Sequence, residues 1–526
     1  MKKNKTTIFV LLFLGITILY PLVTMLVNVK WDTFSELLKS EMFKSSLSNS
    51  LIVTSIATIF SIIIAYLLSY AINRSNIKHK GLLKILITLP MLIPSISHGL
   101  GLINLFGANG IISKTFNFNI VGPVGIVLGS ILYSFPVAFL MLCDGFNYVD
   151  NTMYSVAKVL GMNKWQTFKK ITYCYLKKPI FSSVFAVFTL IFTDYGVPLA
   201  VGGKFTTLPV FLYKQVIGLL DFSRGTMIGL FLLIPAFISF LFDNISKDYS
   251  HGDYSKKYII NNNKVRDIVL RLFVYIIIIF ITIIIGSFIY YAFVDNPSLN
   301  RSLSLIHFEY VLNDKLLTVL SNSLIISVLV SIVGTIMAYL VAYLTARIKG
   351  SMSKIAHILT IISLAIPGIV LGLSYTISFK GTPIYNTYFI LVLVNIVHFM
   401  ASPYLMAYNA LLKLNPNFEV VAMTCHISRF KILKDVIVPC TKTTIREMFA
   451  YFFVNSMITI SAVSFLFNTK TMPMSLLINT YEEDFLLGEA AIISLIILMF
   501  NIIVKLFVYF LNRRETGRRI LHEVDI

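Results

Sequence analysis

Long apolar runs alternate with short polar segments, many of them rich in lysine, along almost the whole chain. Each run is close to the roughly 20 residues that a helix needs to cross about 30 Å of hydrocarbon. The runs are too long and too continuously apolar for barrel strands, and a spanning helix satisfies its own backbone hydrogen bonds. We therefore predict an all-α polytopic membrane protein with about twelve transmembrane helices, centred near residues 18, 60, 94, 133, 190, 233, 281, 331, 366, 398, 456 and 498.

The chain contains an internal repeat. LSNSLI occurs at 47–52 and again at 320–325, which is an offset of 273 in the numbering, and the offset falls to 265 where Ala157 meets Ala422. Eight residues are thus missing from the second copy, and we place the loss between its third and fourth helices. Six crossings per copy make the copies parallel, with a solute path between them. The predicted division is a first half at 1–243, a cytoplasmic linker at 244–266 and a second half at 267–526.

Composition and charge fix the expected topology. Hydrophobic residues make up 57% of the chain, and the mean hydropathy is +0.82, far outside the range of soluble domains. Of the 44 Lys and Arg residues, 32 fall in segments predicted inside, 11 in segments predicted outside, and Lys505 in the last helix. This bias predicts that both termini are cytoplasmic. The net charge of +20 does not indicate nucleic-acid binding, because the basic residues are spread between apolar runs.

Two polar, lysine-bearing stretches have related sequences. VAKVLGMNKWQTFKKI and VAMTCHISRFKILKDV occupy 156–171 and 421–436, within predicted inner loops at 150–178 and 413–443. We expect a short helix, a turn at Gly161 and a second short helix, with an apolar stripe formed by Val156, Val159, Leu160, Met162 and Phe168. Such a segment suits two roles: an interfacial helix on anionic lipid heads, or a docking site for a two-fold cytoplasmic partner.

These stretches resemble the cytoplasmic coupling loop of ATP-binding cassette (ABC) importer permeases. That pattern is Glu-Ala-Ala, three residues, Gly, nine residues, Ile, one residue and Leu-Pro. The first copy departs from it by Ser155 at the Glu position and Tyr173-Cys174 at Leu-Pro, and the second has Glu419 one position early. The residues that we assign to docking, from the resemblance and the charge of the two stretches, are Ala157, Gly161, Lys164, Ile171, Ala422, His426, Lys431 and Pro439.

The resemblance covers nearly the whole chain, as two fused six-helix permease halves. It implies a cytoplasmic pair of ATPase subunits that hold ATP and Mg²⁺, an extracellular solute-binding protein, and a bacterial plasma membrane as the surrounding bilayer. The chain has no GxxxxGK[ST] phosphate loop, and GGKF at 202–205 lacks both the spacing and the hydroxyl. We therefore expect a transport subunit rather than an enzyme, with no catalytic residue, metal or cofactor of its own.

Asp194 is the acidic group deepest in an apolar run, and a carboxylate there is costly and hints at a site. Its counterpart in the repeat is Ile458, so it breaks the two-fold pattern as a site for an asymmetric solute would. The alternative is that Asp194 caps a freed backbone amide at a helix end. Tyr195 is a weaker candidate for the pathway. Pro94 and Pro367, matched in the repeat, are expected to kink helices that line a cavity.

The segment TDYGVPLAVGGKFTTLPVFLYKQVIG resembles fused permeases for 2-aminoethylphosphonate and for iron(III), and we favour the phosphonate group. A secondary transporter driven by an ion gradient is the alternative. It predicts inverted repeats and paired intramembrane carboxylates, and the sequence has neither.

Overall fold

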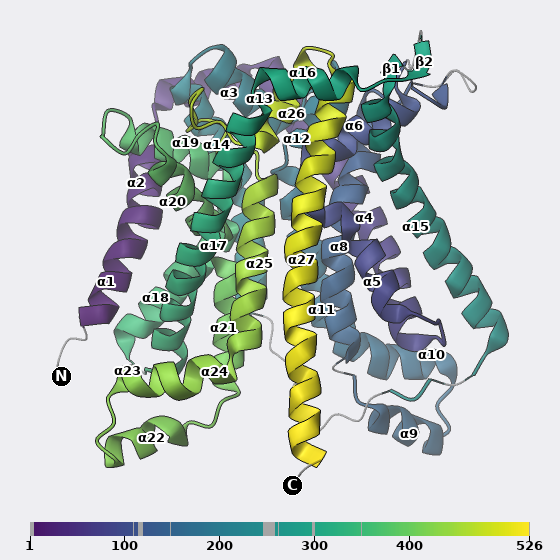
Figure 1. The fold of residues 1–526 in the computed structure, drawn as a ribbon, viewed down its shortest axis with the longest axis vertical. Helices are drawn as coiled ribbons and strands as arrows, with labels where there is room; N and C mark the ends of the chain where they lie inside the picture. The colour runs from purple at the N-terminus through teal and green to yellow at the C-terminus, as the bar shows by residue number, and fades with distance from the viewer. Residues whose placement is uncertain are drawn as a thin grey trace.

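Long helices run between two opposite ends of the molecule (Figure 1). The structure is a computed structural model that describes residues 5–524, apart from 109, 114–118, 148, 246–257, 261, 297–299 and 349. Most of the predicted linker at 244–266 therefore lies outside the described residues. We call the lower end in Figure 1 the loop end, because both lysine-bearing stretches lie there, and the upper end the far end. The first helix begins and the last helix ends at the loop end.

The first half of the chain forms a run of helices with several breaks. In order these are α1 (Lys5–Leu14), η1 (Gly15–Leu19), α2 (Tyr20–Val27), α3 (Trp31–Lys39), α4 (Glu41–Arg74), α5 (Lys80–Thr88), η2 (Leu89–Leu92), α6 (Ser95–Phe106), α8 (Pro123–Asn147), α9 (Asn151–Val159), α10 (Lys164–Thr167), η3 (Phe168–Thr172), α11 (Tyr173–Phe192), α12 (Gly196–Val201), α13 (Leu208–Tyr213), η4 (Lys214–Gly218) and α14 (Phe222–Ile245).

The second half follows the same plan and adds a small hairpin. Its elements are α15 (Lys264–Phe293), β1 (Val294–Asn296), β2 (Asn300–Leu303), α16 (Ile306–Asp314), α17 (Leu316–Arg347), α18 (Ser351–Ile362), η5 (Ser363–Ala365), α19 (Gly368–Phe379), α20 (Tyr388–Phe399), α21 (Ala401–Leu412), α22 (Asn417–Thr424), α23 (Arg429–Ile432), η6 (Leu433–Ile437), α24 (Val438–Cys440), α25 (Lys442–Ile458), α26 (Met474–Glu483) and α27 (Leu487–Val524). The strands β1 and β2 pair antiparallel at the far end.

The predicted all-α membrane class is confirmed, whereas the number of twelve crossings is not. Among the described residues, seven helices are long and apolar enough to cross a bilayer, or up to ten if three bent pairs each count as one span. The bends are 97° between η2 and α6, 111° between η5 and α19, and 54° between α20 and α21. Two further predicted positions fall on α25, which has 17 residues, and on α14, whose apolar part is short.

The internal repeat is confirmed helix by helix. The helix α6 begins at Ser95 and α19 at Gly368, which is the offset of 273, and α8 begins at Pro123 and α20 at Tyr388, which is the offset of 265. The connection between these helices runs from 107 to 122 in the first half, but only from 380 to 387 in the second. The eight missing residues therefore belong to the third-to-fourth-helix connection, as predicted.

The first helix of each copy packs against the other copy. The helices α1 and α2 contact α18 and α19, whereas α15 contacts α4, α5 and α6. The tyrosine side chain of Tyr375 on α19 donates a hydrogen bond to the backbone oxygen of Thr17, at 2.7 Å. The two copies are consequently interlocked in space, although each is continuous in sequence.

The repeated LSNSLI motif fastens the segment that follows the fifth helix of each copy. The hydroxyl of Ser50 accepts a hydrogen bond from the backbone N–H of Leu208 at 2.7 Å, and Ser323 accepts one from Met474 at 2.6 Å. The neighbouring asparagines of the motif donate to the carbonyls of Thr206 and Met472. The motif therefore holds the starts of α13 and α26 in corresponding positions, at an offset of 266.

This offset corrects the alignment near Asp194. The helices α11 and α25 are followed by Thr193 and Thr459 as C-caps, and the same offset of 266 relates these two threonines. Asp194 thus lies opposite Ile460 rather than Ile458. Isoleucine at 460 carries no carboxylate either, so the two copies still differ in charge at this position, as the sequence predicts.

Candidate functional site

The first lysine-bearing loop has the predicted helix, turn and second helix. Asp150 caps the start of α9, and Gly161 forms the turn with a left-handed backbone, at φ of +67°. Asn163 then starts α10 with a capping box, in which its side chain and that of Gln166 each bond the other's backbone N–H. Short polar caps at both helix starts make this geometry locally determined.

The second loop repeats this geometry at the offset of 265. The helix α22 ends at Thr424, and Ser428 caps α23 as Asn163 caps α10. His426 occupies the position of Gly161 and has a left-handed backbone, at φ of 55°. The turn is therefore shared by the two copies although its glycine is not, and His426 carries the strain that a Cβ brings there.

We expect His426→Gly to stabilise the second loop and Gly161→Ala to destabilise the first, each by about 1 kcal/mol, because only glycine adopts this backbone without strain. Space is not the cause at Gly161, since no atom lies within 4 Å of where its Cβ would be. Thermal unfolding and limited proteolysis of the loops in detergent measure both effects. Equal shifts of the same sign in the two variants would contradict the assignment.

The predicted docking residues divide into buried and exposed groups. Ala157 and Ala422 are 2% and 5% exposed, so both alanines are buried where their loops fold. Lys164, Lys431 and Pro439 are exposed, and Ile171 is half-buried. The alanines are thus placed to position the loops, whereas the lysines lie on the surface that a partner would meet.

An aromatic side chain stands at the same place in each loop, and the sequence analysis missed both. Trp165 is 69% exposed and Phe430 is 75% exposed, and the offset that relates Ala157 to Ala422 also relates these two. In the same loops Val159 and Val421 are also exposed, as are Val156 and Leu160 of the predicted stripe, whereas its Met162 and Phe168 are half-buried. The offset of 265 between the copies was enough to show from the sequence that Trp165 and Phe430 occupy corresponding positions.

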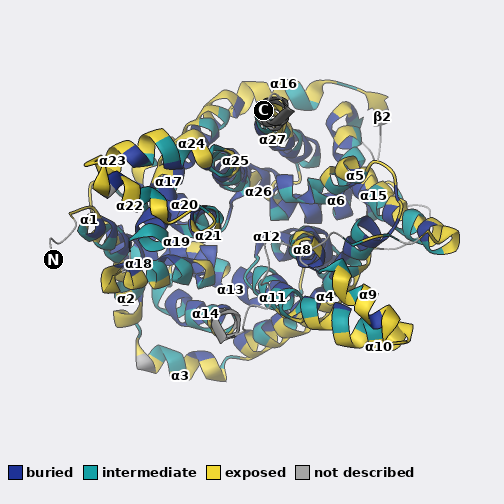
Figure 2. Cartoon of the chain, turned by 90° about the horizontal axis from the view of Figure 1, so that it is seen from below, coloured by how far each residue is buried: buried dark blue, intermediate teal, exposed yellow. Residues whose placement is uncertain are grey.

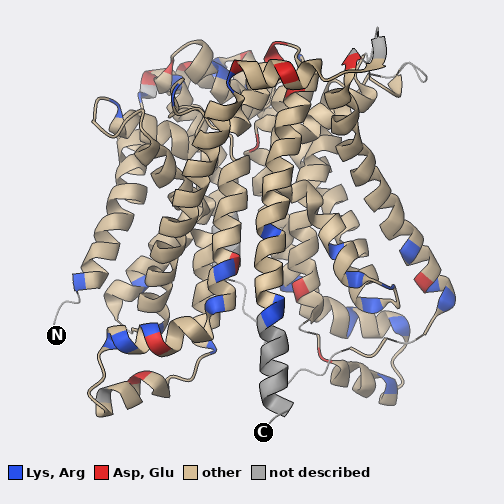
Figure 3. Ribbon diagram, viewed as in Figure 1, with Lys and Arg blue, Asp and Glu red and all other residues tan. Residues whose placement is uncertain are grey.

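The loops lie on opposite sides of the bundle when it is viewed from the loop end (Figure 2). Lysines and arginines gather at this end of the described chain (Figure 3), as the predicted cytoplasmic orientation requires. The two apolar, aromatic patches are therefore presented to the same side of the membrane. A pair of separated, repeat-related patches fits a partner that itself has two copies.

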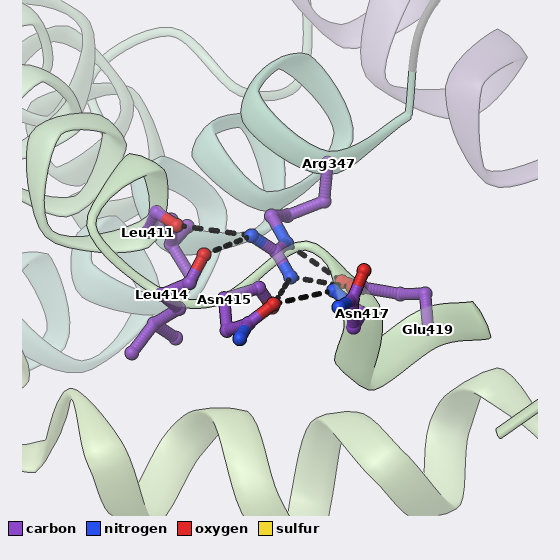
Figure 4. A network of polar contacts seen from close by, with 6 residues as sticks. All are labelled: Arg347, Leu411, Leu414, Asn415, Asn417 and Glu419. Carbon is purple, nitrogen blue, oxygen red and sulfur yellow. Dashed lines mark hydrogen bonds and ion pairs between the residues drawn. The ribbon is translucent and has the colours of Figure 1, made fainter. Parts of the chain in front are cut away.

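A buried arginine fixes the second loop to the end of α17 (Figure 4). The Arg347 guanidinium donates to both carboxylate oxygens of Glu419, with Nε at 2.6 Å from Oε1. It also donates to the backbone oxygens of Leu414 at 2.8 Å and Asn415 at 2.9 Å. Its side chain is 6% exposed and that of Glu419 is 22% exposed. Glu419 is thus paired within the chain.

The first loop is held differently at the corresponding arginine. Arg74 is 3% exposed, the counterpart of Glu419 is Tyr154, and among the described residues Arg74 forms no ion pair. Its Cζ lies 3.7 Å from the ring centre of Tyr258, which precedes α15, and 5.6 Å from that of Tyr154. The neighbouring Ile259 N–H donates to Asn151 on α9 at 3.0 Å. The described end of the linker therefore contacts the first loop.

Asp194 has the contacts of a capping residue. Its carboxylate accepts from the backbone N–H of Val197 at 3.0 Å and of Gly196 at 3.3 Å, at the start of α12. A cavity of about 10 Å³, room for one water, adjoins it and is lined only by residues of the first half. These contacts are those of a residue that caps freed backbone amides at a helix end, which is the alternative that the sequence left open.

Tyr195, in contrast, lies on the seam between the copies. Its hydroxyl is 2.6 Å from that of Ser464, and both side chains are buried. Its ring stacks on Tyr213 with centroids 5.2 Å apart, and Tyr213 in turn lies 6.3 Å from Phe465. Residues of both copies thus close the seam towards the far end.

The two matched prolines stand at sharp breaks. Pro94 and Pro367 precede α6 and α19, where the chain turns by 97° and 111°. At the first break, Asn501 on α27 donates to the freed carbonyl of Leu92 at 2.8 Å, so the neighbouring copy satisfies the broken backbone. At the second break η5 and α19 contact α14 of the first copy, so each break is part of the contact between the copies.

The side chain of His307 on α16 links this helix to α27 and to the strand β1 at the far end. His307 Nδ1 lies 2.9 Å from the Glu489 carboxylate, and Nε2 lies 3.0 Å from the backbone oxygen of Asp295. Both ring nitrogens thus face acceptors, which only the protonated imidazole can satisfy. Hydrogen bonding to Glu489 raises the pKa of His307 above its usual value, against the opposing effect of burial.

Titration of His307 should make the stability of the protein depend on pH. A raised pKa in the folded state means that the contribution is fully present below about pH 6.5 and is lost as pH rises through the folded pKa. We expect the thermal stability of the wild type to fall towards that of His307→Gln over this range. Unfolding curves of both proteins from pH 5.5 to 9 measure the difference, and a constant difference would contradict the protonated assignment.

Comparison with known proteins places the chain in a family. The family model described as binding-protein-dependent transport system inner membrane component matches residues 57–247 and again 334–517. The chain therefore belongs to that family, and its two matches are the two copies of the repeat. It is a multi-pass permease of binding-protein-dependent ABC transport in the bacterial plasma membrane, a transport subunit and not an enzyme.

Its relatives include several transport permeases. The chain is 25% identical over 497 residues to the putative ferric transport system permease protein FbpB 1 of Haemophilus influenzae, covering 88% of this chain and 77% of the relative. It is 24% identical over 532 residues to the ferric transport system permease protein FbpB of Actinobacillus pleuropneumoniae, covering 95% and 76%. The molybdate/tungstate transport system permease protein WtpB of Methanocaldococcus jannaschii is 28% identical over 240 residues, which cover 45% of this chain and 93% of the relative.

Proposed function

We propose that the two loops of this chain dock a pair of cytoplasmic ATPase subunits, and that their closure on ATP drives solute through the seam between the copies. The observation that carries this proposal is the pair of exposed aromatic residues, Trp165 and Phe430, at matching positions of loops at one end of the molecule. Under this proposal the loop end and both termini are cytoplasmic. ATP and Mg²⁺ are held by the ATPase subunits, and a solute-binding protein delivers the solute at the far end.

The cargo that we propose is iron(III). The ferric permeases match nearly the whole chain, and they support iron(III) over 2-aminoethylphosphonate, which the sequence alone had favoured. Membership of the permease family also argues against the alternative of a secondary transporter driven by an ion gradient.

The proposal is tested by reconstituting the full chain in liposomes with an ATPase and a solute-binding protein from the same organism. ATP-dependent uptake of radioactive iron(III), abolished by a non-hydrolysable ATP analogue, is expected. Uptake of iron that follows a proton or sodium gradient without ATP would overturn the coupling mechanism. Uptake of 2-aminoethylphosphonate with no uptake of iron would overturn the proposed cargo.

A further inference from the structure

Two sharp turns at the far end occupy corresponding positions in the two copies. The first turn joins η4 to α14, and the second joins α26 to α27. The helices α14 and α27 begin at Phe222 and Leu487, which is an offset of 265, so Leu220 and Phe485 are counterparts. The offset is 266 at the starts of α13 and α26, and it falls by one because η4 is a π-helix, which takes up an extra residue that the α-helix α26 lacks.

Each turn places a large apolar residue in the left-handed backbone region. Leu220 has φ of 55° and Phe485 has φ of 59°. The N–H that follows each of them donates back to a carbonyl of the preceding helix, from Asp221 at 3.0 Å and from Leu486 at 2.7 Å. Helix ends of this kind usually carry glycine at the left-handed position, because a Cβ crowds the neighbouring carbonyl. Of the five described residues other than glycine with this backbone, only these two are large and apolar.

Packing within the chain does not offset this strain. Leu220 is 72% exposed and Phe485 is 88% exposed, and the adjacent Leu219 is 65% exposed. An exposed side chain adds little to the stability of the fold, so glycine would serve the same turn at a lower cost. Backbone strain that the fold itself does not use is typical of functional positions. The two apolar tips therefore indicate contact with another molecule.

The turns lie beside the short far-end helix of their own copy. Arg224, two residues into α14, forms an ion pair at 3.8 Å with Glu36 on α3. Tyr481, near the end of α26, donates to Asp314 on α16 at 2.9 Å. Figure 2 shows α3 and α16 on opposite sides of the bundle. The far end therefore presents two separated, repeat-related apolar tips, as the loop end presents two aromatic residues.

Only the second turn carries exposed acidic residues directly before its tip. Glu483 and Asp484 precede Phe485, whereas the corresponding residues of the first copy are Gly218 and Leu219. Both carboxylates are exposed, and in the described part of the chain neither forms an ion pair. A lipid surface that took up Phe485 would have to accept these carboxylates too, and anionic head groups repel them. A protein with an apolar pocket bordered by lysine or arginine is the better match.

We propose that Leu220 and Phe485 are the two points on the far end that anchor the solute-binding protein, and that the acids beside Phe485 set its orientation. The family is described as binding-protein-dependent, which makes a binding protein the occupant of this face. A single polypeptide has no two-fold axis, so a charge at only one of the two turns selects one of two possible orientations. This assignment rests on the proposed function, which places the far end outside the cell.

The affinity of the full chain, in lipid nanodiscs, for a solute-binding protein from the same organism tests this surface. Leu220→Gly with Phe485→Gly removes both tips and relieves the strain. We expect its thermal midpoint to rise while its affinity for the binding protein falls at least tenfold, a combination that a purely structural role would not give. Asn386→Gly, at another exposed left-handed position in the 380–387 connection, is the matched control and should bind as the wild type does.

The orientation is tested through the rate of association. Glu483→Lys with Asp484→Lys reverses the charge at the second turn and keeps Phe485. This variant should associate with the binding protein at least tenfold more slowly than the wild type at low salt, and the difference should shrink as salt is added. An unchanged association rate would contradict the role of the acids.

Unchanged affinity in the double glycine variant would overturn the surface, as would an equal loss in Asn386→Gly or no binding to the wild type. A fall in thermal midpoint together with the lost affinity would also overturn it, because the two residues would then support the fold. The binding assay uses neither ATP nor iron. Normal ATP-driven iron uptake by the double glycine variant would remove the surface and leave the proposed function intact. Affinity that depends on both tips, with no ATP-driven uptake by the wild type, would keep the surface and remove the proposed function.

Discussion

Replacing both loop aromatics, as Trp165→Ala with Phe430→Ala, is expected to abolish ATP-driven uptake while the chain remains inserted and folded. Exposed aromatic residues at a docking surface typically contribute about 2 kcal/mol each to association, so the pair should weaken ATPase binding by roughly a thousandfold. Their side chains are 69% and 75% exposed, so truncation removes little packing within the chain. Copurification of the ATPase subunits and uptake by reconstituted liposomes measure the effect.

Two comparisons make this result specific. Phe510→Ala removes an aromatic side chain that is 60% exposed on α27, outside both loops, and should leave docking and uptake unchanged. Charge reversal at Lys164 together with Lys431 tests the same surface through its charges, and should uncouple ATP hydrolysis from uptake. Normal uptake by the double aromatic variant, with the ATPase still bound, would show that the patches are interfacial lipid contacts instead.

Arg347→Met is expected to destabilise the second loop by about 3 kcal/mol, because breaking a buried ion pair by removing one partner costs about 3–5 kcal/mol. The change leaves the Glu419 carboxylate without its cation, and the backbone oxygens of Leu414 and Asn415 without their donor. The lower end of that range applies because Glu419 is 22% exposed. Unfolding in detergent and protease cleavage within 413–443 measure the loss.

The corresponding change in the first copy is the matched control. Arg74→Met removes a cation over the ring of Tyr258 but strands no carboxylate, so the expected cost is about 1–2 kcal/mol. Adding Glu419→Gln to Arg347→Met should recover part of the loss, because it removes the unpaired charge. Equal destabilisation by Arg347→Met and Arg74→Met, or no recovery in the double variant, would show that the ion pair does not fix the loop.

The sequence of the loops was sufficient to predict their local structure. Polar caps such as Asn163 and a turn residue at Gly161 act over a few residues, so helix, turn and helix follow from local chemistry. The same holds for the repeat. Its offsets of 273 and 265 predicted that the second copy is eight residues shorter, and in the structure the shorter segment is the connection at 380–387. The bends at Pro94 and Pro367 were predictable because proline removes a backbone donor.

Interactions between distant segments were not predictable. The Asp194 cap is the contrasting case, because its partners Gly196 and Val197 are two and three residues further on, and the sequence had named capping as an alternative to a pathway role. The number of spans also depended on tertiary structure, because bent pairs rely on neighbouring helices to satisfy freed backbone groups, as Asn501 does for Leu92.

By itself, the sequence determined the membrane class, the duplication and the local form of the two loops, because hydrophobic run length, repeat offset and helix caps are read along the chain. Only the tertiary structure decided that the first helix of each copy packs on the other, that Arg347 holds Glu419, and that Tyr195 meets Ser464 on the seam between the copies. Those contacts join residues that are far apart in the chain, and the physical reason is that packing between helices, not local propensity, brings such residues together.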